Sequence, residues 1–287
     1  MRTETEIISL IKDIAIQDEK IRAAYMEGSR SNPNVPKDIF QDYDIVYIVT
    51  STKPFRENKN WIHQFGEILY MQYPEDNSFI PSDVENYYGW LMQFADGNRI
   101  DLHVATKEYA LSHLELYQIL IDKDGIIPAP QETTDERYWV KEPCETEFQC
   151  TCSEFWWALN NVAKGLWRNE IPYVMDVINF VLRPQLMQLL EWKIGLEHHF
   201  SVSVGKSGKY MKNYLSEKEY EQFLKTYSIA EIESIWNSVF EMCDWFQVIA
   251  AELCEKEKFV YDDKLAENSL SYLKHIRKLP PDAKEIY

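Results

Sequence analysis

The sequence predicts an α+β protein in which a mixed-sheet domain is followed by an all-α helical bundle. Up to about residue 122, short apolar runs alternate with helical spacings. From Pro128 to about Cys150 the periodicity lapses in a polar, proline-containing stretch. Beyond it, apolar residues recur at helical spacing over long segments. We therefore expect an α/β domain at residues 1–133, a linker at 134–150 and a helical domain at 151–287.

The first part opens with a predicted helix at residues 3–20. Ile7, Leu10, Ile11 and Ile14 form one apolar stripe, and Thr3 with Glu6 matches a capping box. Strands are predicted at residues 21–26, 42–50, 86–94, 99–105 and 118–122, and helices at 61–73 and 108–117. The turn residues 96–98 lie between two of these strands, which predicts a hairpin.

In the second part, helical spacing predicts helices at residues 155–167, 172–195, 220–227 and 229–255. Residues 201–204 are the one strand-like run there, and the residues from about 279 are expected to form a frayed tail.

Composition limits the classes of function. The 287 residues are 45% hydrophobic and carry a formal net charge of -17, which argues against binding along a nucleic-acid backbone and suits a polycationic small substrate. We see no signal peptide and no membrane span. The five cysteines fit free thiols in a reducing cytoplasm, and the Cys150–Cys152 pair has no neighbouring ligands to complete a metal site.

The most informative stretch runs from Gly28 to Asp44, and it is read together with Asp101. Asp42 and Asp44 lie two apart at the start of a strand and therefore share a face. Their repulsion amounts to about 1 kcal/mol at 4 Å in water and about 4 at an effective dielectric of 20, and a divalent cation would remove it. Gly28 and Ser29 follow another strand, where turn amides and a hydroxyl can cradle phosphate. The alternative is that the paired aspartates only form a turn.

These residues resemble the active-site pattern of the polymerase-beta-like nucleotidyltransferases. The run MEGSRSNPNVPKDIFQDYDIVYIVT is similar to the aminoglycoside 6-adenylyltransferases, and the similarity extends through RIDLHVATKE, LIDKDG and LWRNEIPYVMDVINF. The resemblance implies a nucleotidyltransferase-type first domain that uses ATP and Mg²⁺ to transfer AMP to an aminoglycoside hydroxyl, such as the 6-position of streptomycin, with release of pyrophosphate.

The resemblance also implies roles for individual residues. Asp42 and Asp44 would hold Mg²⁺, and Gly28 and Ser29 would bind the β- and γ-phosphates. Asp101 has three candidate roles: a further metal ligand, the general base, or an ion-pair partner of Arg99 on the same strand face. Arg30 is either a phosphate clamp or a salt-bridge partner. His103 is expected to be a packed residue.

A second nucleotide contact is predicted at Lys206 and Lys209, in a basic, glycine-containing turn expected to open a helix. It is not a P-loop, because Phe200 stands where that motif requires glycine. The alternative is an ordinary solvated loop. Three residues in the helical half are candidate aminoglycoside ligands: Glu170, Tyr173 and Asp176.

Two other functions remain open from the sequence. One is a nucleotidyltransferase of the same fold that modifies a protein or another small acceptor. The other is a nucleotide-binding module without turnover, against which the intact set of acidic residues argues.

Overall fold

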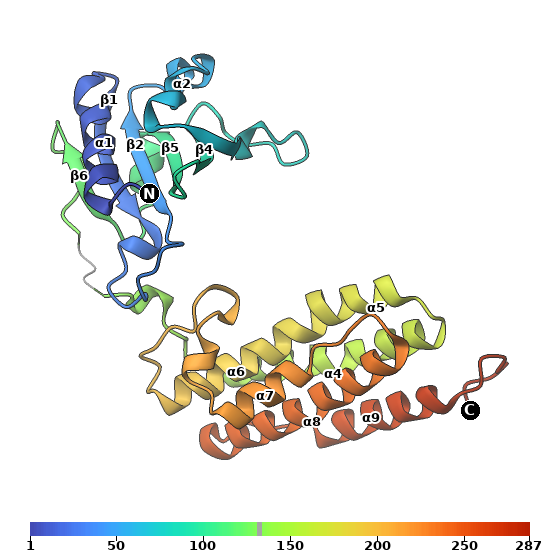
Figure 1. Ribbon diagram of the computed structural model, residues 1–287. Helices are drawn as coiled ribbons and strands as arrows, with labels where there is room; N and C mark the ends of the chain where they lie inside the picture. The colour runs from blue at the N-terminus through green and yellow to red at the C-terminus, as the bar shows by residue number, and fades with distance from the viewer. Residues whose placement is uncertain (131–133) are drawn as a thin grey trace. The chain divides into compact units, whose positions relative to one another are not determined.

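The computed structural model describes residues 1–130 and 134–287, and the chain divides into two compact units, Met1–Asp135 and Glu136–Tyr287 (Figure 1). The first unit is built on a mixed sheet and the second is helical. The expected end of the first domain, at residue 133, lies outside the described residues. Among the helices that are described, none combines the length and apolar character needed to cross a lipid bilayer.

The first unit contains a six-stranded sheet in the order β3-β4-β5-β2-β1-β6. Its strands are β1 (Ile21–Glu27), β2 (Tyr43–Val49), β3 (Ile68–Gln72), β4 (Tyr87–Phe94), β5 (Arg99–Thr106) and β6 (Gln118–Asp122). The central pair β2 and β5 is parallel, and the other pairs are antiparallel. The predicted hairpin of β4 and β5 is confirmed, with the turn at residues 95–98.

The two faces of the sheet differ in what covers them. Alternate side chains of β2, beginning with Tyr43, point to one face and pack with α1 (Glu4–Gln17), α2 (Lys53–Glu57) and the 3₁₀ turn Trp61–Phe65. The other face carries Val46 and Ile48 and packs against the short helix α3 (Lys107–Ser112). Asp44 alternates with Val46, so it belongs to this second face, which we call the acidic face.

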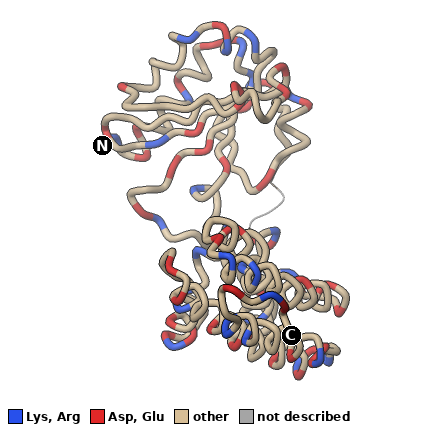
Figure 2. Tube along the Cα trace, turned by 90° about the vertical axis from the view of Figure 1, so that its right-hand side faces the viewer, with Lys and Arg blue, Asp and Glu red and all other residues tan. Residues whose placement is uncertain are grey.

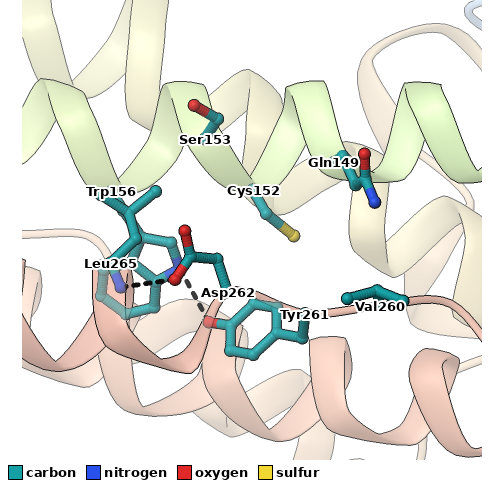
Figure 3. Close-up of a pocket in the computed structure, with 8 residues that line it drawn as sticks. All are labelled: Gln149, Cys152, Ser153, Trp156, Val260, Tyr261, Asp262 and Leu265. Carbon is teal, nitrogen blue, oxygen red and sulfur yellow. Dashed lines mark hydrogen bonds between the residues drawn. The ribbon is translucent and has the colours of Figure 1, made fainter.

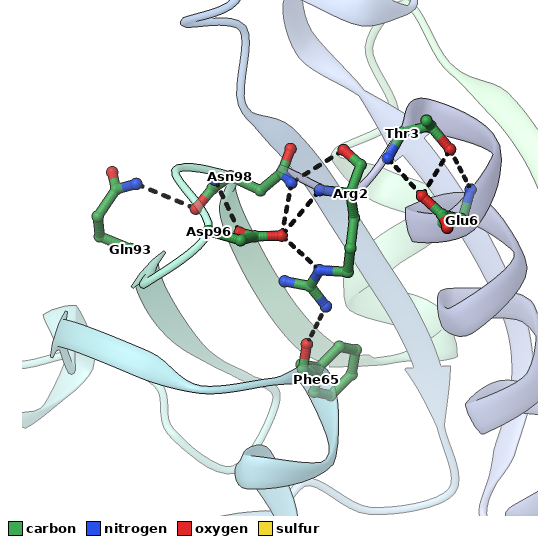
Figure 4. A network of polar contacts seen from close by, with 7 residues as sticks. All are labelled: Arg2, Thr3, Glu6, Phe65, Gln93, Asp96 and Asn98. Carbon is green, nitrogen blue, oxygen red and sulfur yellow. Dashed lines mark hydrogen bonds and ion pairs between the residues drawn. The ribbon is translucent and has the colours of Figure 1, made fainter.

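A polar network fixes the start of the chain to the hairpin turn (Figure 4). Arg2 donates to Asp96 Oδ2 from its backbone N at 3.0 Å and from Nε at 2.7 Å, and Asn98 N donates to Asp96 Oδ1 at 3.0 Å. Beside it, Thr3 and Glu6 form the predicted capping box of α1. The start of α1 is therefore fixed both by the contacts of Arg2 with the hairpin turn and by the capping box.

The second unit is a bundle with one continuous core drawn from its helices. Its α-helices are α4 (Glu145–Trp167), α5 (Ile171–Val177), α6 (Arg183–Glu197), α7 (Glu217–Lys225), α8 (Ile232–Glu257) and α9 (Asp263–Lys278), and a π-helical segment, Ile178–Leu182, joins α5 to α6. Phe155 and Phe246 stack at 3.8 Å between ring centroids where α4 meets α8. Acidic residues occur along both units, as Figure 2 shows.

Several predicted elements are wrong in type or extent. Residues 61–73 were predicted to be a helix, but they form the 3₁₀ turn and the edge strand β3. Gly66 separates them at φ +133°, a value that no helix contains. Residues 145–150, assigned to the linker, are the first turns of α4, because the Cys144 backbone N–H donates to the Glu147 side chain at 2.9 Å and caps the start of the helix. The helix α9 was not predicted.

Candidate active site

Three aspartates gather at the end of the sheet where β2 begins. Asp42 lies directly before β2, Asp44 is its second residue, and Asp101 is the third residue of β5. Each offers a carboxylate oxygen, and these three oxygens all lie within 4.8 Å of one another. Asp44 lies opposite Asp101 in the parallel pair, so both side chains leave the same face of the sheet. The structure thus brings together carboxylates from two separate segments of the sequence.

A fourth carboxylate extends this group into a row. Glu27, the last residue of β1, is the register partner of Asp44, and Asp44 is the partner of Asp101. Three neighbouring strands therefore each place one acidic side chain at the same level of the acidic face. Asp101 is buried, with 7% of its surface exposed, and Glu27 and Asp44 are partly buried.

The electrostatics of the row reflect its crowding. Burial raises the pKa of Asp44 to about 7, and the charges of Asp42, Asp101 and Glu27 contribute to the shift. Burial also raises the pKa of Glu27 to about 7, with a contribution from Glu115. Several negative charges in a partly desolvated site repel each other, and a bound cation is the usual way to stabilise them.

Arg99 partly compensates this charge. Its Nε donates to Asp101 Oδ1 at 2.8 Å and its Nη2 donates to Asp101 Oδ2 at 2.6 Å, while Nε lies 3.8 Å from Asp42 Oδ2. The ion pair that the sequence left open as an alternative for Asp101 is therefore present, and it coexists with the cluster of three aspartates. A two-pronged contact of this kind also fixes the orientation of the carboxylate.

Arg30 supports the loop that leads into β2. Its Nε donates to the backbone oxygen of Asp42 at 2.8 Å, its Nη2 donates to that of Gln41 at 2.8 Å, and Nη1 lies 3.2 Å from Glu4 Oε2. The guanidinium also lies 3.8 Å from the ring centre of Tyr43. These contacts favour the salt-bridge alternative for Arg30 over a phosphate clamp, and they hold Asp42 in position.

The turn before the loop depends on glycine. Gly28 has φ +70°, in the left-handed region, and begins the 3₁₀ turn Gly28–Arg30. A Cβ at this position would lie 1.9 Å from Asp44 Oδ2, so the bend passes directly against the carboxylate. Ser29 lies in the same turn, and Gln41 Nε2 is 3.5 Å from its hydroxyl. A hydroxyl and backbone amides therefore stand beside the aspartates.

Comparison with known proteins identifies the family. The model of the streptomycin adenylyltransferase family matches residues 1–276. The chain belongs to the streptomycin adenylyltransferase family. The aminoglycoside 6-adenylyltransferase of Bacillus subtilis (strain 168) is 38% identical over 267 residues, which cover 92% of this chain and 94% of that protein. The enzyme of the same name from Staphylococcus aureus is 36% identical over 251 residues, 86% of this chain and 89% of that protein.

Among solved structures, the crystal structure of an aminoglycoside 6-adenyltransferase from Bacillus subtilis aligns with a TM-score of 0.49 at 34% identity and covers 97% of this chain and 100% of its own. Family membership confirms the resemblance that the motifs around Gly28 and Asp44 indicated.

The remaining predicted residues of this family member lie in the helical unit. Lys206 and Lys209 are exposed, but their loop opens no long helix as expected, because it forms only the 3₁₀ turns Lys206–Gly208 and Met211–Asn213. Three predicted aminoglycoside ligands are exposed at the start of α5 and along it: Glu170, Tyr173 and Asp176. The roles of these residues in binding remain predictions.

The helical unit also contains a pocket of about 470 Å³ between α4 and the segment that enters α9 (Figure 3). Trp156 Nε1 donates to the Tyr261 hydroxyl at 2.7 Å, and Asp262 Oδ1 accepts from the backbone N of Leu265 at 2.9 Å. These polar groups stabilise the junction of α4 and α9, and none of the predicted site residues lines this pocket.

Sequence reasoning missed Glu27 as a member of the site. The predicted first strand ended at residue 26, whereas β1 continues through Glu27. Extending the alternation by one residue would have placed Glu27 on the face of Tyr25, at the strand end that precedes Gly28. The signal was present, but the residue was assigned to the turn.

Proposed function

We propose that this protein is a Mg²⁺-dependent adenylyltransferase that transfers AMP from ATP to a hydroxyl of an aminoglycoside, at the 6-position of streptomycin, and releases pyrophosphate. The observation that carries the proposal is the cluster of Asp42, Asp44 and Asp101 beside the bend at Gly28, in a chain of the streptomycin adenylyltransferase family. The matched relatives are named aminoglycoside 6-adenylyltransferases, which supports this choice of acceptor and of ATP.

The residues present fit a magnesium ion. Mg²⁺ prefers carboxylate oxygens together with substrate phosphates and water, and Asp42, Asp44 and Asp101 offer three such oxygens within 4.8 Å of one another. When bound, the ion would neutralise charge on the reacting phosphate. The bidentate contact with Arg99 orients Asp101, which suits a metal ligand better than a group that must take a proton from the acceptor.

The protein's own groups then position the nucleotide. The amides of the bend and the Ser29 hydroxyl would hold phosphate oxygens, since the positive φ of Gly28 lets the backbone come close to the aspartates. Arg30 keeps the backbone at Asp42 in place from the far side. Nucleotidyl transfer needs mostly such positioning and neutralisation of charge.

We also propose a cytoplasmic setting. The reaction consumes ATP, and the five cysteines are free, which suits a reducing compartment.

The direct test is an assay of the purified full-length chain with ATP, Mg²⁺ and streptomycin. We expect pyrophosphate release that depends on the aminoglycoside, together with a product whose mass has increased by one adenylyl group. Asp42→Asn and Asp44→Asn should fold normally and lose about three orders of magnitude in rate, since the ion contributes several kcal/mol to the transition state. ATP turnover without an adenylylated aminoglycoside from a panel of these antibiotics would contradict the proposal.

A further inference from the structure

A small cavity opens on the acidic face and shares one residue with the row of carboxylates. Its volume is about 250 Å³, and we call it the tyrosine cavity. Its lining includes six residues with polar or aromatic groups: Tyr25, Glu27, Tyr87, Tyr109, His113 and Glu115. Glu27 is also the register partner of Asp44, so the cavity begins where the row of acidic side chains ends.

The Tyr25 hydroxyl points to a ligand in this cavity. The side chain is only 2% exposed, yet within the described part of the chain no hydrogen bond uses its hydroxyl, and its contact with Tyr117 is a T-shaped packing of the two rings. Buried hydroxyls are normally paired. Among the described residues, the single fully enclosed side-chain polar atom without a partner is Arg183 Nε, so the Tyr25 hydroxyl must keep some access to free space. As a lining residue, it finds that space in the cavity.

The opposite part of the lining is a stack of aromatic rings. Tyr87 stacks on Tyr109 at 5.0 Å between centroids, and Tyr109 stacks on His113 at 4.1 Å. On its other side Tyr87 stacks on His103 at 4.7 Å, and Gly89 makes room for that imidazole. The faces of Tyr87 and Tyr109 are used in these stacks, so the rings form an apolar aromatic wall of the cavity.

The charge of the lining selects the kind of ligand. Glu27 and Glu115 are both carboxylates, so a phosphate would be repelled there, whereas a guanidinium or ammonium group would find a charge-assisted acceptor in Glu27 beside aromatic walls. Sites for whole drug-sized ligands measure about 300–1,000 Å³, so a cavity of this size accommodates one ring-borne cation and not an entire aminoglycoside.

We propose that the tyrosine cavity binds a guanidinium or ammonium group of the acceptor, with Glu27 as its counter-ion and the Tyr25 hydroxyl as a hydrogen-bond partner of the sugar. This rests on the proposed function and adds a specificity site to it. Because Glu27 belongs both to the cavity and to the row of carboxylates, an acceptor held by its cation here is held beside the aspartates.

The test uses the full-length chain with Mg²⁺ and the non-transferable analogue α,β-methylene-ATP. Streptomycin is titrated by calorimetry into wild type, Glu27→Gln and Tyr25→Phe. The control Glu67→Gln removes an exposed carboxylate that directly precedes the edge strand β3. We expect Glu27→Gln to weaken streptomycin binding about tenfold or more, and Tyr25→Phe about threefold, since charged hydrogen bonds contribute more than neutral ones. Glu67→Gln should bind like wild type.

The Tyr25→Phe variant keeps the ring in its packing, and a thermal unfolding curve confirms the fold of each variant. Unchanged streptomycin affinity in both cavity variants would overturn the inference. It would also be overturned if the cavity variants lost affinity only for the ATP analogue, because the cavity would then be a nucleotide site. Wild type that binds streptomycin without turning it over would contradict the proposed function instead. Wild type that neither binds nor modifies it would contradict both.

Discussion

At the scale of single residues, the geometry of the site depends on a glycine as much as on the acids. Gly28 has a left-handed φ, and its Cα hydrogen faces the Asp44 carboxylate where any side chain would collide. Asp44 cannot move away freely, because its neighbours on both sides are the other carboxylates of the row. Only glycine at position 28 therefore allows the bend to pass this close to the Asp44 carboxylate.

We predict that Gly28→Ala lowers the turnover number at least about a hundredfold, because a shift of the ligand by an ångström is enough for such a loss. The matched control is Gly125→Ala, whose φ of +64° resembles that of Gly28 but whose Cβ would meet nothing within 4 Å. Gly125→Ala should lose about 1 kcal/mol of unfolding free energy from the backbone strain, and Gly28→Ala should lose more because its Cβ also displaces Asp44. Rates and urea unfolding check this, and equal activity of the two variants would contradict it.

Much of the site could be predicted from these residues. The spacing of Asp42 and Asp44 places both at one strand mouth, and the alternation around Asp101 predicts a strand. What the sequence does not contain is the register of β2 against β5, which are separated by two other strands along the chain. The contacts of Arg30 with the backbone of Asp42 have no pattern in the sequence either, because a loop conformation creates them.

At the scale of elements, the sequence predicts those whose periodicity reflects burial. β6 has the predicted bounds, and α1 begins at its predicted capping box. The error at residues 61–73 arises because Trp61 and Phe65 are spaced as on a helix, but they pack as a 3₁₀ turn onto the aromatic rings of the core. The next residues form the strand β3 because they pair with β4. The burial pattern of β3 does not alternate, so the sequence there did not indicate a strand.

The network around Asp96 gives a prediction for the pH dependence of stability. Burial alone would raise the pKa of Asp96, but hydrogen bonds from Arg2 and Asn98 outweigh it and hold this pKa well below its usual value. The ionised Asp96 carboxylate therefore contributes fully to the free energy of unfolding above the unfolded-state pKa of about 3.9. This contribution is lost as the pH falls toward the pKa of Asp96 in the folded protein. Asp96→Asn should lower the unfolding free energy at pH 7 by about 1–3 kcal/mol.

Thermal unfolding of wild type and Asp96→Asn between pH 7 and pH 2 measures this effect. The difference between them should shrink as the pH falls below about 4. Asp13→Asn, which changes an exposed carboxylate on α1, should follow wild type throughout. A difference that stayed constant with pH would show that the charge of Asp96 is not what stabilises the turn.

At the scale of the whole molecule, two units with separate cores share one function under the proposal. The aspartates and the tyrosine cavity lie in the first unit, and the exposed lysines of the loop at residues 205–209 lie in the second. The net charge of -17 makes such clustered lysines unusual in this chain and favours a cationic acceptor over an anionic polymer.

We predict that Lys206→Ala combined with Lys209→Ala raises the KM for ATP about tenfold, because the predicted contacts of these two ammonium groups with the triphosphate would be lost. Lys264→Ala with Lys278→Ala removes two exposed lysines from α9 and changes the net charge by the same amount. Steady-state kinetics with ATP varied at saturating streptomycin compares the two. An equal KM in both double variants would assign the loop to an ordinary solvated surface.

The account as a whole depends on a divalent cation held by the three aspartates. The most direct measurement is the binding of Mn²⁺, as a paramagnetic stand-in for Mg²⁺, followed by electron paramagnetic resonance in the presence of ATP. Wild type and Asp13→Asn should bind the ion alike, and Asp44→Asn should bind it at least about tenfold more weakly, since it loses a charged ligand. The same Mn²⁺ affinity in Asp44→Asn and wild type would contradict the account.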